Sequence, residues 1–264
     1  MTKYLKVFWR SVRLSTMKFL AYSTHFLLGL ITSFVYGLMN LIFFWLVFEA
    51  GGVSEIAGFS VHEVYFVFAI TQLIYVLTVI FFFESANMFR YHIHQGWLDM
   101  LMTKPISTVF YSMFERLHYF ASLSVFLYVI VIFYYSVPYL SVEWNVGNIL
   151  KLGLIVVVGW LIFSILIWIS SLMWLFLPRF RILRMVVTNS FDFNKNPPKV
   201  YPGALQWFLS IILPVLLIGN QTYYWLRGEY GWQMILRDLG ILVIFILIYI
   251  LMWKGGLKKY NSAN

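Results

Sequence analysis

Two membrane-length apolar runs of the chain are separated by the mixed stretch Gln95-Gly96-Trp97-Leu98-Asp99-Met100-Leu101-Met102-Thr103-Lys104-Pro105-Ile106. Within it, Leu98, Leu101 and Met102 follow the i, i+3, i+4 spacing that places side chains on one face of a helix. Asp99 and Thr103 fall outside that face, and Pro105 ends the helix because proline lacks the backbone N–H that a further turn requires. The pattern predicts a short surface helix whose apolar face is bound by a partner outside the membrane.

The composition excludes a soluble globular domain. Of the 264 residues, 62% are hydrophobic and 11% are charged, whereas soluble domains contain about 25% charged residues. About 20 apolar residues are needed to cross a hydrocarbon core ~30 Å thick. The sequence contains six candidates, at residues 26–47, 64–83, 117–135, 152–177, 207–226 and 239–253, of which the last is short. We therefore expect an all-α membrane protein whose six spans form a single transmembrane domain over residues 1–264.

The lysine and arginine residues predict the topology. With the loops assigned alternately to the two sides, one side receives sixteen of the 19 cations and the other receives only Lys151, Arg227 and Arg237. By the positive-inside rule the crowded side is cytoplasmic, which places both termini and the loop 96–105 there. Residues 178–202 are then also cytoplasmic, with 194–199 as an extended, proline-containing linker. Because the cations lie at the ends of apolar runs rather than in one patch, the net charge of +9 does not indicate a nucleic-acid partner.

Residues 2–22 are expected to form an amphipathic helix on the membrane surface. One helical arc is apolar and the opposite arc is basic: Tyr4, Leu5, Phe8, Trp9 and Val12 against Lys3, Lys6, Arg10 and Arg13. Such a helix lies in the interface with its basic face toward lipid headgroups. The alternative is that these cations are ordinary flanking residues of the first span.

Two local signals concern individual spans. Ser60 and Glu63 have the spacing of a capping box, which predicts a helix start just before the second span. In the fifth span, Pro214 removes a helical hydrogen bond and Gly219 follows closely, so we expect a kinked or broken helix there.

The chain lacks the residues that would support catalysis, nucleotide hydrolysis or metal binding. It contains no cysteine, no G-x-x-x-x-G-K-[ST] phosphate-binding motif and no ionisable side chain in the middle of a span. His92 and His94 would lie about 200° apart on a helix, which does not suit one metal ion, and interfacial histidines near headgroups are the simpler interpretation. Glu115 and Arg116 either pair with a neighbouring segment or mark the membrane boundary. We expect no catalytic residue and no metal site.

Polar side chains inside the spans are the candidates for a translocation pathway. The residues are Asn40, Thr71, Gln72, Asn220 and Gln221. In membrane proteins such side chains also form hydrogen bonds between helices. The sequence leaves both roles open.

Three sets of residues carry a family resemblance. Residues 96–106 are similar to the motif G-x-L-D-x-L-L-x-(R/K)-P-(I/L) that follows a second span. Tyr201-Pro202 precedes the fifth span and Leu213-Pro214 lies within it, while residues 256–263 are similar to the ending G-L-x-(R/K)-Y-x-S-A. On these residues the chain resembles the permease subunits of type 2 ABC transporters, in the branch that has six spans and no fused ATPase.

The resemblance implies that residues 88–104 contain a coupling helix, which docks into a cytoplasmic ABC ATPase dimer. The residues implied in coupling are Arg90, Gly96, Trp97, Leu98, Asp99, Leu101, Lys104 and Pro105. Trp97 and the insert 194–199 depart from the family pattern. The resemblance also implies that ATP and Mg²⁺ belong to the ATPase, so that this chain needs no cofactor, and that a second permease, identical or paralogous, completes the pathway.

The expected function is half of the pathway of an ATP-driven exporter in a bacterial plasma membrane. The cargo expected is amphiphilic or hydrophobic, such as a drug, a peptide or a lipid-like molecule, and membrane lipid is the other partner. One alternative is a carrier or channel that works without ATP. Another is a membrane anchor or scaffold subunit.

Overall fold

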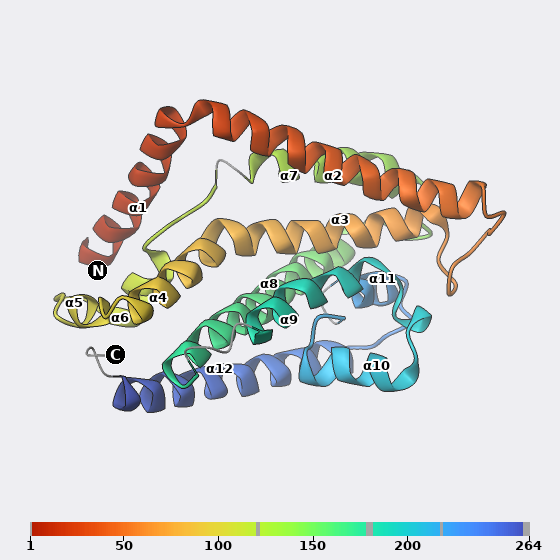
Figure 1. Cartoon of the computed structure of the whole chain (residues 1–264). Coiled ribbons are helices and arrows are strands. Elements are labelled where there is room, and N and C mark those ends of the chain that lie inside the picture. The colour runs from red at the N-terminus through yellow and green to blue at the C-terminus, as the bar shows by residue number, and fades with distance from the viewer. Residues whose placement is uncertain (1, 120–121, 178–181, 217–218, 261–264) are drawn as a thin grey trace.

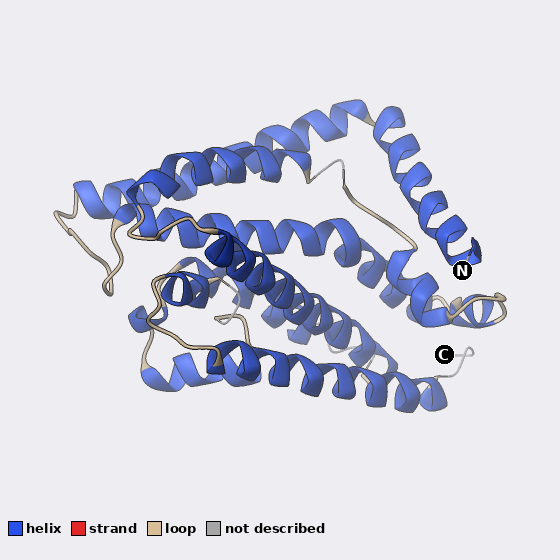
Figure 2. Cartoon of the chain, turned by 180° about the vertical axis from the view of Figure 1, so that it is seen from behind, coloured by secondary structure: helices blue, strands red, loops and turns tan. Residues whose placement is uncertain are grey.

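A computed structural model describes residues 2–119, 122–177, 182–216 and 219–260. Within these ranges the regular structure is helical, and the only β interaction is an isolated bridge between Ile56 and Phe59. The helices form an elongated bundle (Figures 1 and 2). The start of the first helix and the end of the last lie at one end, here called the terminal end, and the loop 50–60 lies at the other, here called the loop end.

Long apolar helices confirm that the chain is a multi-pass membrane protein. Four of the described helices are long and apolar enough to cross a membrane. They are α2 (Ser23–Glu49), the continuous helix Val61–His94, the helix Val146–Leu175 that begins with α8 (Val146–Leu172), and α12 (Gln233–Lys259). These match the expected runs 26–47, 64–83, 152–177 and 239–253, although the second extends eleven residues further, to His94, than the apolar run itself.

The helix Val61–His94 is the centre of the bundle. It joins α3 (Val61–Thr78), a π-helical turn at Val79–Phe83 and α4 (Glu84–His94) without a break. In its most apolar part 61% of the residues are buried, compared with 11% for α2, which therefore lies at the edge. Its start is capped as the sequence predicts, because the Glu63 carboxylate accepts a 2.7 Å hydrogen bond from the Ser60 N–H.

The N-terminal helix α1 (Thr2–Ala21) is separate from α2. The predicted helix over 2–22 is therefore present, and Tyr22, with φ −124° and ψ 48°, breaks it from α2. Figure 1 shows α1 at a steep angle to α2, reaching down toward the terminal end. This angle turns α1 toward the short helices α5 and α6 rather than along the bundle.

The third expected span begins later than its apolar run. Its helix is α7 (Leu123–Ser136), extended by a single 3₁₀ turn at Val137–Tyr139, while residues 115–118 have no helical structure. The His118 N–H donates to the Ile80 carbonyl (3.0 Å), and Ser85 exchanges two hydrogen bonds with the backbone of Arg116. Backbone groups of this stretch thus form their hydrogen bonds with the central helix rather than within a helix of their own. This explains why the third helix begins later than the expected start at residue 117.

The fifth expected span, 207–226, does not cross the bundle. It consists of α10 (Gly203–Trp207), a π-helical turn (Phe208–Ile212) and α11 (Asn220–Leu226), separated by a break that contains Pro214 as predicted. Figure 1 shows α10 and α11 together in the half of the bundle nearest the loop end. Tyr223 of α11 packs against Phe59, just before α3 begins, with ring centroids 5.6 Å apart. The prediction of a spanning helix is wrong here, because the proline break lets the chain fold back as a hairpin.

The segment after α8 also departs from the expected topology. Helix α9 (Ile182–Ser190) lies against α8, and the 3₁₀ turn Phe191–Lys195 that follows it lies against α3. The chain leads on toward the loop end through a second 3₁₀ turn at Pro198–Val200 (Figure 1). Thr71, deep within α3, donates to the Asn194 carbonyl (3.4 Å). Residues 194–199 are thus not a linker at the terminal end.

The position of Lys195 explains why the charge count places this segment at the wrong end of the bundle. Its ammonium lies 2.6 Å from Asp192, three residues earlier, and contacts the hydroxyl of Tyr36 in the middle of α2. Lys199 lies 5.8 Å from the ring of Tyr224 in α11. The positive-inside rule counts cations without their partners, so a lysine neutralised by a nearby aspartate is assigned to the wrong place.

Gly219 offers a test of the folded-back hairpin. An added Cβ would overlap Thr71 Oγ1 and lie 3.4 Å from Oδ1 of Asn194, so Gly219→Ala is expected to lower the unfolding free energy by about 1–3 kcal/mol. Gly153→Ala in α8 is the control, because its Cβ meets nothing within 4 Å. The measurement is the thermal midpoint of the detergent-solubilised protein. A Gly219→Ala midpoint equal to that of the control would contradict the contact between the hairpin and α3.

Candidate functional site

The segment that follows the central helix folds into a compact turn at the terminal end. The described helix α4 stops at His94, and Gly96 adopts φ +69°, a left-handed conformation that glycine adopts without strain. The Trp97 N–H donates to the His92 carbonyl (2.8 Å), which closes the turn. Helix α5 (Leu98–Met102) begins directly afterward. The predicted short helix is present, and Gly96 sets its direction.

The apolar face of α5 points into the protein. Leu98 and Leu101 are fully buried and belong to the main hydrophobic core. Burial of each leucine contributes roughly 1.5–3 kcal/mol, which holds in place a helix of five residues that could not persist alone. The prediction that this face binds an external partner is therefore wrong for Leu98 and Leu101.

A different apolar surface is exposed on the same segment. Trp97, Met100 and Met102 are 48%, 54% and 41% exposed, and Tyr91 on α4 is 44% exposed. The helical period identified which side chains share a face, but it did not show which face the core covers. Asp99 lies beside these residues and is exposed.

Two cations implied in coupling are held within the chain. The guanidinium of Arg90 lies 5.2 Å from the ring of Trp174, and the ammonium of Lys104 lies 3.6 Å from the ring of Tyr111. Both contacts are cation–π interactions, which stabilise by about 0.5–1 kcal/mol at exposed sites. Arg90 and Lys104 thus brace the segment, while Asp99 is free to face outward.

The N-terminal helix supports the segment from the other side. The Pro105 carbonyl accepts a 2.9 Å hydrogen bond from Lys3 Nζ. Helix α6 (Thr108–Phe114) packs on α1 through Phe110, whose ring centroid lies 4.8 Å from that of Tyr4 in an edge-on arrangement. Helices α1, α4, α5 and α6 therefore form one packed unit at the terminal end.

A buried pair joins α4 to the stretch after α6. His92 Nε2 lies 2.9 and 3.1 Å from the two carboxylate oxygens of Glu115, and the His92 side chain is almost completely buried. Of the two interpretations of Glu115, pairing with a neighbouring segment is confirmed. His94 is exposed, so only one of the two histidines takes part. Within the described ranges, no group of three or more His, Asp or Glu side chains could hold a metal ion.

The last helix meets the same unit. Trp253 of α12 stacks on Phe89 of α4 with ring centroids 5.4 Å apart. Gly256 allows α12 to approach the end of the helix Val146–Leu175, because an added Cβ would lie 2.6 Å from Leu175 Cδ1 and 2.9 Å from its Cβ. The glycine of the C-terminal motif is therefore explained by helix packing, whereas residues 261–263 of that motif lie outside the described residues.

Two of the polar residues considered for a pathway lie together in the central helix. Gln72 accepts a 2.9 Å hydrogen bond from the Tyr128 hydroxyl and lines a cavity of about 400 Å³ between α2, α3, α7 and α9. Thr71 donates its hydroxyl hydrogen to the Asn194 carbonyl and does not line this cavity. Both are buried, so Gln72 combines a helix-to-helix hydrogen bond with access to a cavity.

Two of the other pathway candidates do not line the Gln72 cavity. The Asn40 amide donates to the Tyr36 carbonyl of its own helix (2.8 Å). Gln221 contacts Arg237 and lines a separate cavity of about 290 Å³ at the loop end. The side chain of Asn220 lies outside the described residues. Of the four candidates whose side chains are described, only Gln72 lines the cavity between α2, α3, α7 and α9.

Breaking the buried pair should loosen the terminal end. His92→Ala leaves Glu115 without its partner, and we expect a cost of about 1–3 kcal/mol with faster hydrogen exchange of the Arg116 and His118 amides. His94→Ala, at an exposed histidine two residues away, should leave that exchange unchanged. Hydrogen exchange detected by mass spectrometry measures both. Equal protection in the two variants would show that the pair does not anchor residues 115–118.

Comparison with known proteins identifies the family. The family model described as ABC-2 family transporter protein matches residues 34–264, which is most of the chain. The match covers the central helix, the α5 turn and α12, and it begins after α1. Neither the curated proteins nor the solved structures contain a match. The chain belongs to the ABC-2 transporter family, as a membrane permease component of an ABC transporter.

Proposed function

We propose that this chain is half of the translocation pathway of an ATP-driven exporter and that its α4–α5 turn binds a separate ABC ATPase dimer. The observation that carries the proposal is the continuous helix Val61–His94, which ends in a turn locked to the core by Leu98 and Leu101. With 34 residues at 1.5 Å per residue, this helix is about 50 Å long. A displacement applied at α5 therefore moves a rod that reaches the loop end.

The exposed surface of the turn suits a protein partner. Trp97, Met100 and Met102 form an apolar surface next to the Asp99 carboxylate. Tryptophan, tyrosine and methionine are enriched in the centres of interfaces, where truncation of a tryptophan often costs 2 kcal/mol or more. Leu98 and Leu101 act by positioning this surface rather than by binding.

The π-helical turn at Val79–Phe83 gives the rod a place to bend. A π-helical turn shifts the hydrogen-bond register, and the Ile80 carbonyl within it accepts the His118 N–H. A displacement of α5 can then be transmitted in two ways. One is along α4 to α3, and the other is through residues 115–118 to α7. Both helices line the cavity that contains Gln72.

A second permease would complete the pathway. Helix α2 leaves an apolar face uncovered, with Leu28, Met39 and Phe43 each more than half exposed. The aromatic and hydroxyl groups around Gln72 suit an amphiphilic or hydrophobic cargo, moved as the paired subunits switch between two states. ATP and Mg²⁺ belong to the ATPase, because the chain has no phosphate-binding loop.

The orientation proposed is a bacterial plasma membrane with the terminal end in the cytoplasm. Lys195 and Lys199 lie away from the terminal end, contrary to the charge count. The cations of α1, of the α4–α6 segment and of the end of α12 lie at the terminal end, as the count predicts. This places the α5 surface where a cytoplasmic ATPase can reach it.

Site-specific cross-linking tests the coupling proposal. Because the chain has no cysteine, Met100→Cys introduces a unique thiol, which should cross-link to the ABC ATPase in the assembled transporter. Trp232→Cys, at an exposed tryptophan near the loop end, should give no cross-link. Cross-linking from both positions, or from Trp232→Cys alone, would contradict the proposed orientation.

The functional consequence is measured in membrane vesicles. Trp97→Ala is expected to weaken ATPase binding by at least tenfold, as truncation of an anchoring tryptophan typically does, while Trp232→Ala should bind normally. Export should cease on ATP depletion. Binding and transport unaffected by Trp97→Ala would refute the coupling role, transport that survives ATP depletion would favour a carrier or channel, and ATPase binding without any transport would favour a scaffold.

A further inference from the structure

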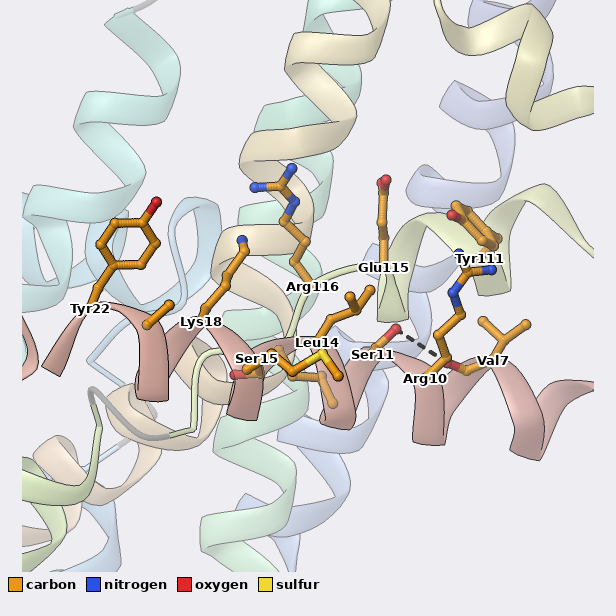
Figure 3. Close-up of a pocket in the computed structure, with 13 residues that line it drawn as sticks. Val7, Arg10, Ser11, Leu14, Ser15, Lys18, Tyr22, Tyr111, Glu115 and Arg116 are labelled. Carbon is orange, nitrogen blue, oxygen red and sulfur yellow. Dashed lines mark hydrogen bonds between the residues drawn. The ribbon is translucent and has the colours of Figure 1, made fainter.

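A third cavity lies at the terminal end, apart from the Gln72 and Gln221 cavities. Its volume is about 520 Å³, and it lies between the C-terminal half of α1 and the non-helical residues that follow α6 (Figure 3). The cavity exists because α6 packs on the first half of α1, whereas residues 115–117 are drawn toward the central helix by the contacts of Ser85 and His92. It is a built feature of the fold.

Three cations from two separate segments line this cavity. Arg10 and Lys18 come from α1, and Arg116 comes from the non-helical stretch. Figure 3 shows the side chains of Lys18 and Arg116 extending toward the same side. Burial and the charge of Arg116 lower the pKa of Lys18, and Glu84 partly offsets this.

No described carboxylate forms an ion pair with these cations. Among the described residues, none of the three has a carboxylate within 4.0 Å. Glu115 is the only acidic residue that lines the cavity, and it is already bound to His92 at 2.9 Å. The like charges of Lys18 and Arg116 repel each other, so an anion that enters the cavity beside them is attracted by both.

The remaining lining is apolar or hydroxylic. Val7, Leu14, Met17 and Leu117 supply apolar surface, and Ser15, Tyr22 and Tyr111 supply hydroxyl groups. Leu14 and Met17 are also about half exposed, and Leu20 nearby is 69% exposed. An occupant that fits this lining has two parts, a negatively charged group that accepts hydrogen bonds and a hydrocarbon portion. Because α1 has the amphipathic pattern of a helix that lies on a membrane surface, the occupant must also be present at that surface.

We propose that this cavity binds the phosphate headgroup of an anionic phospholipid from the leaflet that α1 contacts. The phosphate lies beside Lys18 and Arg116, whose side chains extend toward the same side of the cavity, and the acyl chains lie along Leu14 and Met17. General attraction of basic residues to a charged surface does not account for the site, because Arg116 is not on α1 and converges with it only through the fold. The proposal does not depend on the ATPase partner.

Lipid binding measured by native mass spectrometry tests the proposal, with two double variants that remove the same charge. Lys18→Gln combined with Arg116→Gln removes two cavity cations, whereas Lys6→Gln combined with Arg13→Gln removes two exposed cations of α1 that do not line it. The probes are phosphatidylglycerol and phosphatidylcholine. We expect wild type and the Lys6/Arg13 variant to retain one phosphatidylglycerol, with affinity on the order of tenfold higher than for phosphatidylcholine, and the Lys18/Arg116 variant to lose this preference.

Several outcomes would overturn the proposal. Equal loss in both double variants would mean that only surface charge attracts the lipid, and equal retention of the two lipids by wild type would remove the anionic preference. Inorganic phosphate at constant ionic strength distinguishes a free anion: complete displacement of phosphatidylglycerol would show that the acyl chains contribute nothing. Normal lipid binding together with loss of a co-purifying protein from the Lys18/Arg116 variant would assign the cavity to a protein contact. The thermal midpoint of each variant confirms that it is folded.

Discussion

The structure depends on one continuous helix that must satisfy its backbone inside a membrane. Backbone groups without partners are costly in hydrocarbon, so a long rod such as Val61–His94 is held by its own hydrogen bonds along its length. The single place where the register changes, Val79–Phe83, is also where the chain after α6 adds a hydrogen bond from His118. The late start of α7 is a consequence, since residues 115–118 bond to the rod instead of to themselves.

The sequence predicted the features that depend on local chemistry. The long apolar helices, the cap at Ser60 and the break at Pro214 each follow from residues within one segment, and the structure confirms them. The path of the chain after this break could not be predicted from the sequence, because a proline break is compatible with both a kinked span and a folded-back hairpin. Gly219, with no room for a side chain against Thr71, marks the hairpin, but that contact is visible only in three dimensions.

The predictions for residues 194–199 and for Leu98 and Leu101 are wrong for a related reason. The charge count and the helical period both consider a residue without the residues that it contacts in the folded protein. The counting rule places Lys195 in a cytoplasmic loop because it takes no account of the pairing with Asp192, three residues earlier. The helical period predicts an external partner for Leu98 and Leu101 because periodicity defines a face without showing what covers it. Of the residues expected to act in coupling, Trp97 and Asp99 remain on the surface, and the leucines, Arg90 and Lys104 support them from within.

The terminal end connects the proposed coupling surface to the membrane surface through direct contacts. Helix α6 packs on both α1 and α4, and Glu115, which lines the cationic cavity, also holds His92 on α4. An anion beside Arg116 would therefore lie within two residues of the pair that fixes the stretch 115–118 against the central helix. Because packed elements move between discrete arrangements rather than deforming continuously, occupancy of that cavity and displacement of α5 act on the same rigid unit. Lipid binding in the cavity and a displacement of α5 would then affect each other if the central helix moves as proposed.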